Sequence, residues 1–182
     1  MINLGLIQNM TQFFKTKGLI YTLLLGTSIV GFSLTTQAED EVDQYQNVAL
    51  QVVAKMTEAQ RTYYQKNGNF RAPINDLKKD FDLTLPPTFD YAVRTTSEAA
   101  YSYVIPAQSK VSGQLKAYVG GAFITPNQTP KITTIICEST KPGQIRPADP
   151  QLVRGTDLAN PTKLALQCGD FSVRVPDSKV TF

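Results

Sequence analysis

The chain has 182 residues, room for about one domain, and its 42% hydrophobic and 18% charged residues exclude a disordered or fibrous protein. It contains no histidine, which removes the usual general base and the commonest metal ligand, and its two cysteines are too few for a structural zinc site. The formal net charge of +3 falls to +1 without the first 38 residues, so bulk charge does not indicate a polyanion-binding protein.

The first 38 residues have the layout of a secretory signal. Lys15 and Lys17 precede an apolar run from Gly18 to Leu34, and the small-residue sequence that ends at Ala38 offers a cleavage site. As a helix the run reaches about 25 Å, slightly less than the roughly 30 Å of a bilayer core. We predict a signal peptide that is cleaved after Ala38, and the alternatives are an uncleaved membrane anchor or a buried core helix.

A signal peptide and an anchor both place residues 39–182 outside the cytoplasm, because the positively charged flank stays inside. The expected location is therefore periplasmic or extracellular, or in the inner membrane with the globular part outside. The membrane would be a partner only if the segment 1–38 were not cleaved.

The segment from Asp43 to Asn67 predicts an amphipathic helix, with Gly68 as its terminator. Its apolar side chains recur at spacings of three and four: Tyr45, Val48, Ala49, Val52, Val53, Met56, Ala59, Tyr63 and Tyr64. The simplest interpretation of this stripe is that it packs in the core. A second interpretation is an interaction face towards other proteins, for which the candidate residues are Tyr45, Val48, Val52, Met56 and Tyr63.

Beyond the helix, Pro73 predicts the start of a short helix that runs to Asp80. From Phe89 the pattern changes to a period of two, which predicts strands at residues 101–105, 115–125, 131–137 and 171–175. In the last of these, Phe171, Val173 and Val175 are expected on a half-buried face. A long irregular loop is expected from Glu138 to Lys163.

This order of elements predicts an α+β fold in which the N-terminal helix covers one face of a small antiparallel sheet. The expected domain organisation is a signal peptide or anchor at residues 1–38 and one globular head at 39–182, with the helix at about 43–67 and the sheet at about 89–182.

Cys137 ends a predicted strand, and Cys168 lies just before the last one. In an oxidising compartment two cysteines at such places should pair and close the C-terminal loop. A loop of this length gives roughly 3–4 kcal/mol in the chain-entropy model. The alternative is a pair of free buried thiols.

Part of the chain resembles a known family. The run from Met56 to Phe70, with its Ala-Gln, Tyr-Tyr and Asn-Gly pairs, looks like the end of the long helix of type IV pilins and type II secretion pseudopilins. The segments 101–106, 115–123 and 135–138 resemble their sheet strands. The combination is most similar to the type IV pilin-like G/H family, over about residues 42–140 and more loosely to Cys168.

The resemblance implies a pilin-like fold and a non-enzymatic structural or accessory role in a type IV pilus or type II secretion apparatus. The implied partners are other pilin or pseudopilin subunits, or envelope proteins. The N-terminus departs from the family, because Leu19 follows Lys17-Gly18 and Leu23 stands where a glutamate is usual. The chain therefore resembles a pilin head with a different export signal, and a soluble periplasmic or secreted binding module is the alternative.

No cofactor is expected, with calcium as the one candidate. Major pseudopilins bind calcium in a C-terminal loop, and the corresponding segment here carries Asp149, Asp157 and Asp170. No EF-hand spacing is present, so these carboxylates are more simply explained as solvated surface groups. Basic residues beyond Asp90 are scattered, which does not favour DNA binding. No nucleophile–base pair is visible, so an enzyme is not expected.

Overall fold

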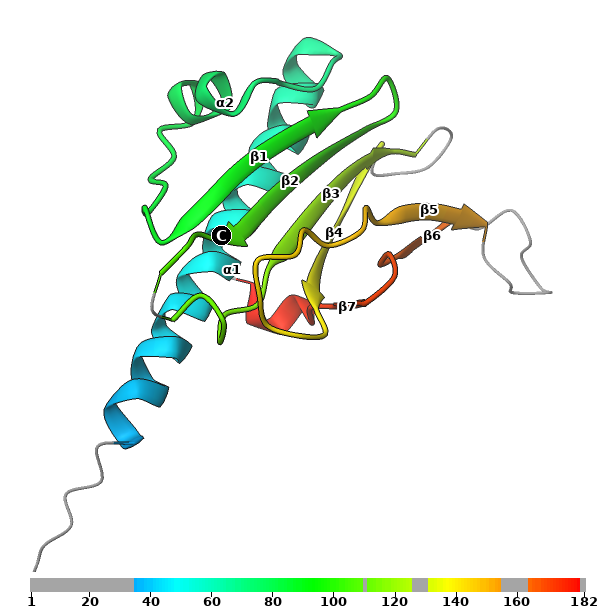
Figure 1. Ribbon diagram of the computed structural model, residues 1–182. Coiled ribbons are helices and arrows are strands. Elements are labelled where there is room, and N and C mark those ends of the chain that lie inside the picture. Colours follow the sequence, from blue (N-terminus) through cyan, green and yellow to red (C-terminus); the bar gives the residue numbers. More distant parts are fainter. Residues whose placement is uncertain (1–34, 110, 126–130, 155–163, 181–182) are drawn as a thin grey trace, which may run out of the picture. The chain divides into compact units, whose positions relative to one another are not determined.

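Residues 35–109, 111–125, 131–154 and 164–180 are described by a computed structural model of the protein (Figure 1). The apolar run of the predicted signal or anchor lies outside these residues, and so does the junction at Leu19. Within the described part, a long helix packs on one face of an antiparallel sheet, which confirms the predicted α+β, pilin-like fold.

Helix α1 spans Thr35–Asn67, so it begins before the expected start at Asp43. It ends as predicted, because Gly68 has a φ of +72° and its N–H donates to the Tyr64 carbonyl at 2.8 Å. From Ala49 onward one face of the helix is buried against the sheet. Among the described residues no helix combines the length and the apolar character that crossing a membrane requires.

The predicted short helix is also present, as α2 at Ile74–Asp80. Pro73 lies at the position before the first helical residue. Phe70 and Phe81 dock this part of the chain onto α1, since the Phe70 ring lies 4.7 Å from that of Tyr64 and the Phe81 ring 6.5 Å from that of Tyr63. The α2 segment is thereby fixed to the end of α1.

The main sheet is antiparallel throughout, with the strand order β1-β2-β3-β4-β7. The strands are β1 at Phe89–Thr95, β2 at Ala99–Pro106, β3 at Tyr118–Ile124, β4 at Ile132–Ser139 and β7 at Ser172–Arg174. The three predicted strands at 101–105, 115–125 and 131–137 correspond to β2, β3 and β4. β1 precedes them as an additional strand, paired with β2 over its whole length.

The prediction of an irregular loop from Glu138 to Lys163 was wrong in part. It contains strand β5 at Gln151–Arg154, which pairs with β6 at Leu164–Gln167 in a separate two-stranded sheet. Each strand is only four residues long, and prolines interrupt the sequence before and after β5. A short alternation among prolines gives too weak a signal to separate a strand from a loop.

The expected half-buried strand at 171–175 was also wrong in part. β7 has only three residues, Phe171 lies outside it with a positive φ of 58°, and the chain leaves the sheet at Val175 for the 3₁₀ turn Asp177–Lys179. Phe171 is 87% exposed and Val173 51%, whereas Val175 is buried. The alternation correctly predicted extended chain, but β7 is an edge strand, and no layer formed by the described residues covers Val173.

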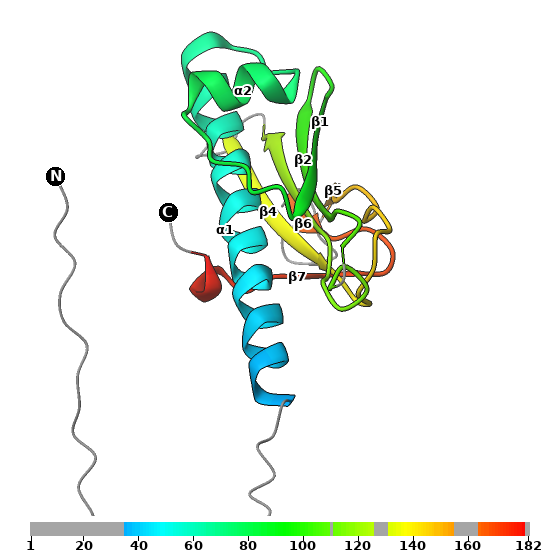
Figure 2. The same cartoon turned by 60° about the vertical axis from the view of Figure 1, so that its left-hand side comes forward.

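The main sheet is covered on both faces, and Figure 2 shows α1 on one side of it and the β5–β6 hairpin on the other. One core cluster joins α1 to the sheet, and its members include Val53, Met56, Val104, Tyr118 and Ile136. The second cluster, on the opposite face, is formed by Ala99, Tyr103, Val119, Phe123, Ile135 and Cys137, with Leu152 and Leu166 of the hairpin packed against it. This double cover explains why β3 is buried almost throughout.

Gly120 and Gly121 allow these layers to approach closely. A Cβ atom on Gly120 would lie 1.8 Å from Thr57 Oγ1 on α1, and one on Gly121 would lie 2.8 Å from Pro150 on the other side. The Gly-Gly pair in β3 thus marks the place where α1 and the segment at Pro150 both pack closely against the sheet.

Candidate functional site

The predicted disulfide is present and joins Cys137 of β4 to Cys168 just after β6, with a Cα–Cα distance of 5.8 Å. Cys137 is fully buried in the core cluster beneath the hairpin, and Cys168 packs against the same cluster. The bond closes the segment between these residues and ties the hairpin to the main sheet. The alternative of two free thiols is therefore excluded.

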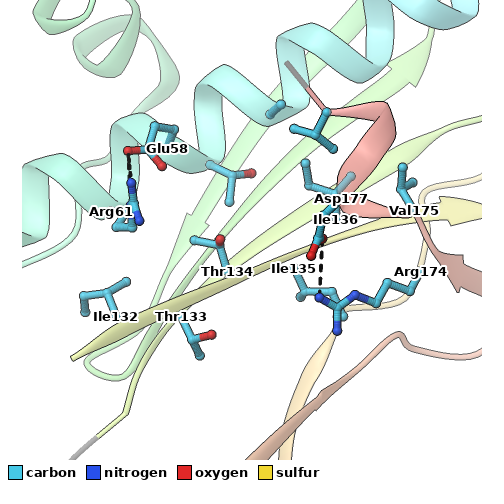
Figure 3. A pocket seen from close by; sticks show the side chains of 13 residues that line it. Glu58, Arg61, Ile132, Thr133, Thr134, Ile135, Ile136, Arg174, Val175 and Asp177 are labelled. Carbon is cyan, nitrogen blue, oxygen red and sulfur yellow. Dashed lines mark hydrogen bonds and ion pairs between the residues drawn. The ribbon is translucent and has the colours of Figure 1, made fainter. Parts of the chain in front are cut away.

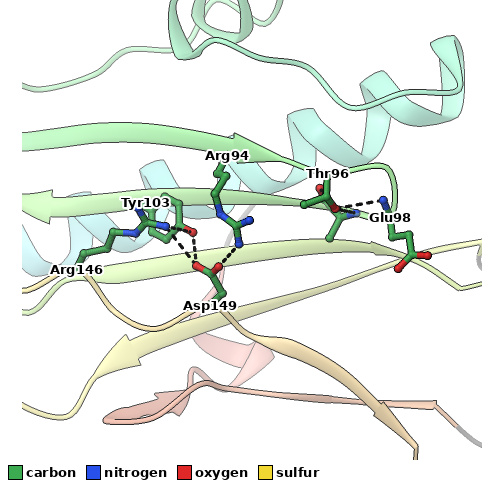
Figure 4. A network of polar contacts seen from close by, with 7 residues as sticks. Arg94, Thr96, Glu98, Tyr103, Arg146 and Asp149 are labelled. Atoms are coloured by element: carbon green, nitrogen blue, oxygen red, sulfur yellow. Dashed lines mark hydrogen bonds and ion pairs between the residues drawn. The ribbon is translucent and has the colours of Figure 1, made fainter.

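A polar cluster holds the same segment at a second place, and we call its four residues, Arg94, Tyr103, Arg146 and Asp149, the clasp (Figure 4). The Tyr103 hydroxyl donates to one carboxylate oxygen of Asp149, and the Arg94 guanidinium donates to the other. Arg146 donates to the Tyr103 hydroxyl oxygen at 2.7 Å and to Asp149 at 3.4 Å. Strands β1 and β2 are thus linked to the loop that precedes β5.

Aromatic faces support the two arginines of the clasp. The Arg146 guanidinium lies 3.9 Å from the centre of the Tyr103 ring, and that of Arg94 lies 4.3 Å from the centre of the Tyr101 ring. Burial raises the pKa of Tyr103, and its hydrogen bond to the Asp149 carboxylate raises it further. Tyr103 therefore stays a neutral donor over the physiological pH range.

The end of α1 is fixed by a buried side-chain amide. Gln60 is fully buried, its Nε2 donates to the Arg71 carbonyl at 2.6 Å, and its Oε1 accepts from the Arg71 N–H at 2.9 Å. The Arg71 guanidinium in turn lies over the Tyr63 ring at 5.4 Å and pairs with Asp80 of α2 at 2.8 Å. The Ala-Gln and Tyr-Tyr pairs thus define how the chain leaves the helix.

Comparison with known proteins places these features in a family. The model of the family described as type IV pilin-like G and H matches residues 46–168. The chain belongs to the type IV pilin-like G and H family. No curated protein and no solved structure matches it. The match begins within α1, at Gln46, and ends at Cys168, so most of the helix, the clasp and both cysteines lie within the pilin-like G/H domain, whereas residues 35–45 of α1 precede the match.

The candidate interaction face on α1 lies against the protein's own sheet. Val52 and Met56 are buried in the core that α1 shares with the sheet, and Tyr45 and Val48 are partly buried beside it. Tyr63 contacts Phe81 and Arg71. This pilin-like domain therefore uses the apolar stripe for its own packing, and a role of these residues towards other subunits stays a prediction.

A shallow groove of about 320 Å³ lies between α1 and β4 (Figure 3). It contains two ion pairs, Glu58–Arg61 on α1 and Arg174–Asp177 at the C-terminal end, and in each pair the opposite charges cancel. The strand contributes the side chains from Ile132 to Ile136. The lining offers no nucleophile with an adjacent base, so we assign it no chemistry.

A second groove, of about 360 Å³, lies beside the exposed Phe171, and we call it the Phe171 groove. Apolar side chains dominate its lining, among them Pro142, Ile145, Pro147 and Phe171. Three charged residues also line it: Arg146 of the clasp, and Lys141 and Asp170, whose side chains form no ion pair with any described residue. Sequence reasoning missed this surface because it expected Phe171 on the buried face of a strand.

The three calcium candidates are not brought together by the described residues. Both carboxylate oxygens of Asp149 accept from clasp donors, and Asp170 is exposed in the turn before β7. Asp157 lies outside the residues that the structure describes. Within those residues no group of three or more metal-binding side chains is positioned around one point. Calcium binding stays a prediction, which titration calorimetry can check.

Proposed function

We propose that the protein is an exported, non-enzymatic pilin-like subunit that acts by assembly with other pilin or pseudopilin subunits, or with envelope proteins. The role would be structural or accessory, in a type IV pilus or a type II secretion apparatus. Family membership supports the structural class, since pilin-like proteins work through packing rather than catalysis. The disulfide supports export, because such bonds form and persist in oxidising compartments.

The observation that carries this proposal is the exposed beginning of α1. Residues 39–41, 43, 44 and 47 are exposed, whereas burial of the helix begins at Ala49. In Figure 1 this part of α1 projects beyond the sheet. We call this projecting part of α1, residues 39–47, the stalk. A stalk can reach a neighbouring subunit or a membrane anchor, whereas a self-contained ligand-binding domain needs no such projection.

The stalk also separates charge along the molecule. Glu39, Asp40, Glu41 and Asp43 are exposed and carry four of the fifteen acidic side chains, so residues 44–182 have a net charge of +5. An acidic stalk next to a basic head favours ordered contacts between subunits over random association.

The alternative is a soluble periplasmic or secreted binding module that uses a pilin-like head. Cleavage after Ala38 favours this reading, because it would remove the apolar run and leave the stalk free in solution.

N-terminal sequencing of protein recovered from the cell envelope separates the two. A start at Leu19, or an intact N-terminus together with cross-links to pilin subunits, supports assembly through the retained apolar segment. A start at Glu39 in protein that fractionates without pilins overturns the assembly proposal in favour of the binding module.

A further inference from the structure

Large exposed apolar side chains gather in the C-terminal part of the described residues. Ile145 is 82% exposed, Phe171 87% and Val173 51%, and the first two line the Phe171 groove. Two such side chains on the rim of one hollow differ from the single apolar residues scattered over ordinary surfaces. Covering them would remove apolar area from water.

The backbone holds Phe171 in a conformation that bulky residues rarely adopt. Its φ is +58°, a value that glycine or asparagine reaches far more readily. Both the N–H and the hydroxyl of Thr140 donate to the Phe171 carbonyl, at 2.8 and 3.0 Å. Ser172 binds back to the Gly169 carbonyl through its N–H and its hydroxyl. These four hydrogen bonds hold Phe171 in an unfavourable conformation that exposes its aromatic ring. Such a conformation indicates a functional surface.

The walls of the groove are fixed before any partner arrives. Gly169, next to the lining residue Asp170, lies so close to the lining residue Ala148 that a Cβ atom on it would meet the Ala148 side chain at 2.7 Å. The clasp at Asp149 holds one wall to the sheet, and the disulfide at Cys168 holds the other. A preorganised surface loses little conformational entropy on binding.

The Phe171 groove combines a projecting side chain, that of Phe171, with a hollow and with two side chains of opposite charge. Lys141 and Asp170 both line the groove, both are exposed, and neither side chain forms an ion pair or hydrogen bond with any described residue. In a twofold contact each copy presents the same patch, so a residue of one copy meets a different residue of the other. Phe171 can then enter the partner's groove, while Lys141 meets the partner's Asp170.

We propose that the Phe171 groove is a twofold docking surface for a second copy of this chain. The apolar contact supplies the free energy, and the two Lys141–Asp170 pairs across the axis set the orientation. The patch is small compared with the surface of a permanent dimer, so the contact is weak and depends on local concentration. This inference goes beyond the proposed function, because a twofold pair forms equally between subunits of an apparatus and between secreted modules.

Photo-cross-linking in cells that make the full chain tests the contact directly. Phe171 is replaced by benzoylphenylalanine, which keeps an aromatic ring at this exposed position, and the matched control carries the same group at the exposed Lys78 of α2. We expect an adduct of twice the chain mass for position 171 and none for position 78. Peptide mapping should place the cross-link between residues 139 and 148, or at 170–171, of the second copy.

Charge reversal distinguishes the twofold arrangement from nonspecific contact. Lys141→Glu places two acidic groups against each other, and Asp170→Lys places two basic groups, so each single change should lower the adduct about fivefold or more. The double variant restores opposite charges across the axis and should recover the adduct. Electrophoresis without reductant verifies that each variant keeps its disulfide.

Each result decides the proposal. Recovery in the double variant supports it. Absence of the double-mass adduct, an adduct with another protein, a cross-link outside the mapped residues, or failure of the double variant to recover overturns it. None of these outcomes changes the conclusion from N-terminal sequencing, so the two proposals fail separately.

Discussion

The side-chain amide of Gln60 exchanges two hydrogen bonds with the backbone of Arg71. The donor–acceptor distances are 2.6 Å to the Arg71 carbonyl and 2.9 Å from its N–H, and the glutamine is fully buried. The pair closes the turn between Asn67, the last residue of α1, and Ile74, the first residue of α2. The contact therefore joins the end of α1 to the segment that leads into α2.

Replacing Gln60 by leucine should lower the free energy of unfolding by about 1–3 kcal/mol, because it leaves a partly buried N–H and C=O without partners. Urea denaturation of the purified protein measures the change. Gln65→Leu, at an exposed position on the same helix, serves as the control and should stay within about 0.5 kcal/mol of the parent. Equal effects of the two substitutions would show that the Arg71 turn is stable without Gln60.

The end of α1 could be predicted from the sequence because its signals are local. The apolar stripe recurs every three or four residues, and the Asn67-Gly68 pair stops it where Gly68 adopts its positive φ. The start of α1 could not be placed in the same way. Glu39, Asp40 and Glu41 are exposed, so no apolar periodicity extends the helix to residues before Asp43.

Gly120 should not tolerate a methyl group. A Cβ atom there would lie 1.8 Å from Thr57 Oγ1 and 3.3 Å from Val53 Cγ2, so α1 would have to move away from β3. Gly120→Ala should therefore destabilise the protein by about 1–3 kcal/mol in thermal or urea unfolding. Gly113→Ala is the matched control, because a Cβ atom at Gly113 meets nothing within 4 Å, and it should be near neutral.

Thr57→Ala in the Gly120→Ala background should recover part of the lost stability, since it removes the nearest atom. We expect a coupling free energy of about 1 kcal/mol between the two sites in a double-mutant cycle. Additive effects would contradict direct contact between α1 and β3 at this point.

The clasp and the β5–β6 hairpin lay beyond sequence reasoning for a different reason. Tyr103 and Asp149 are 46 residues apart, and neither belongs to a short motif, so no local pattern relates them. Cys137 and Cys168 are 31 residues apart, but their pairing was predictable because the chain has only two cysteines. A long-range contact can thus be predicted from a residue type that occurs only twice, whereas a contact between common polar residues cannot.

Stability should fall at high pH because several tyrosines are buried. Burial is the largest cause that raises the pKa of Tyr91, Tyr101, Tyr103 and Tyr118 in the folded protein. The unfolded chain loses these protons near pH 10, and the folded protein retains them to higher pH. The folded state then binds more protons, so the free energy of unfolding is constant below about pH 9 from this source and decreases above about pH 10.

Urea denaturation between pH 8 and 11.5 measures this decrease, and tyrosinate absorbance reports the ionisation itself. Tyr91→Phe is the informative variant, since it removes the hydroxyl that donates to the Pro86 carbonyl at 2.6 Å and leaves the ring in place. It should be less stable at neutral pH but lose less stability above pH 10 than the parent. An unchanged pH slope would contradict the raised pKa of Tyr91.

The disulfide and the clasp hold the same segment by different physical means. Replacing Cys137 and Cys168 together by alanine should cost roughly 3–4 kcal/mol, mainly because the unfolded chain gains conformational freedom. Asp149→Ala should cost about 1–3 kcal/mol through the native state, because it leaves the Tyr103 hydroxyl and the Arg94 guanidinium without their acceptor. Since one change acts on the unfolded chain and the other on the folded one, their effects should add within about 0.5 kcal/mol.

Urea unfolding of the parent, the cysteine variant, the clasp variant and their combination measures the coupling free energy between the two changes. A coupling above about 1 kcal/mol would mean that the disulfide positions the clasp in the folded protein.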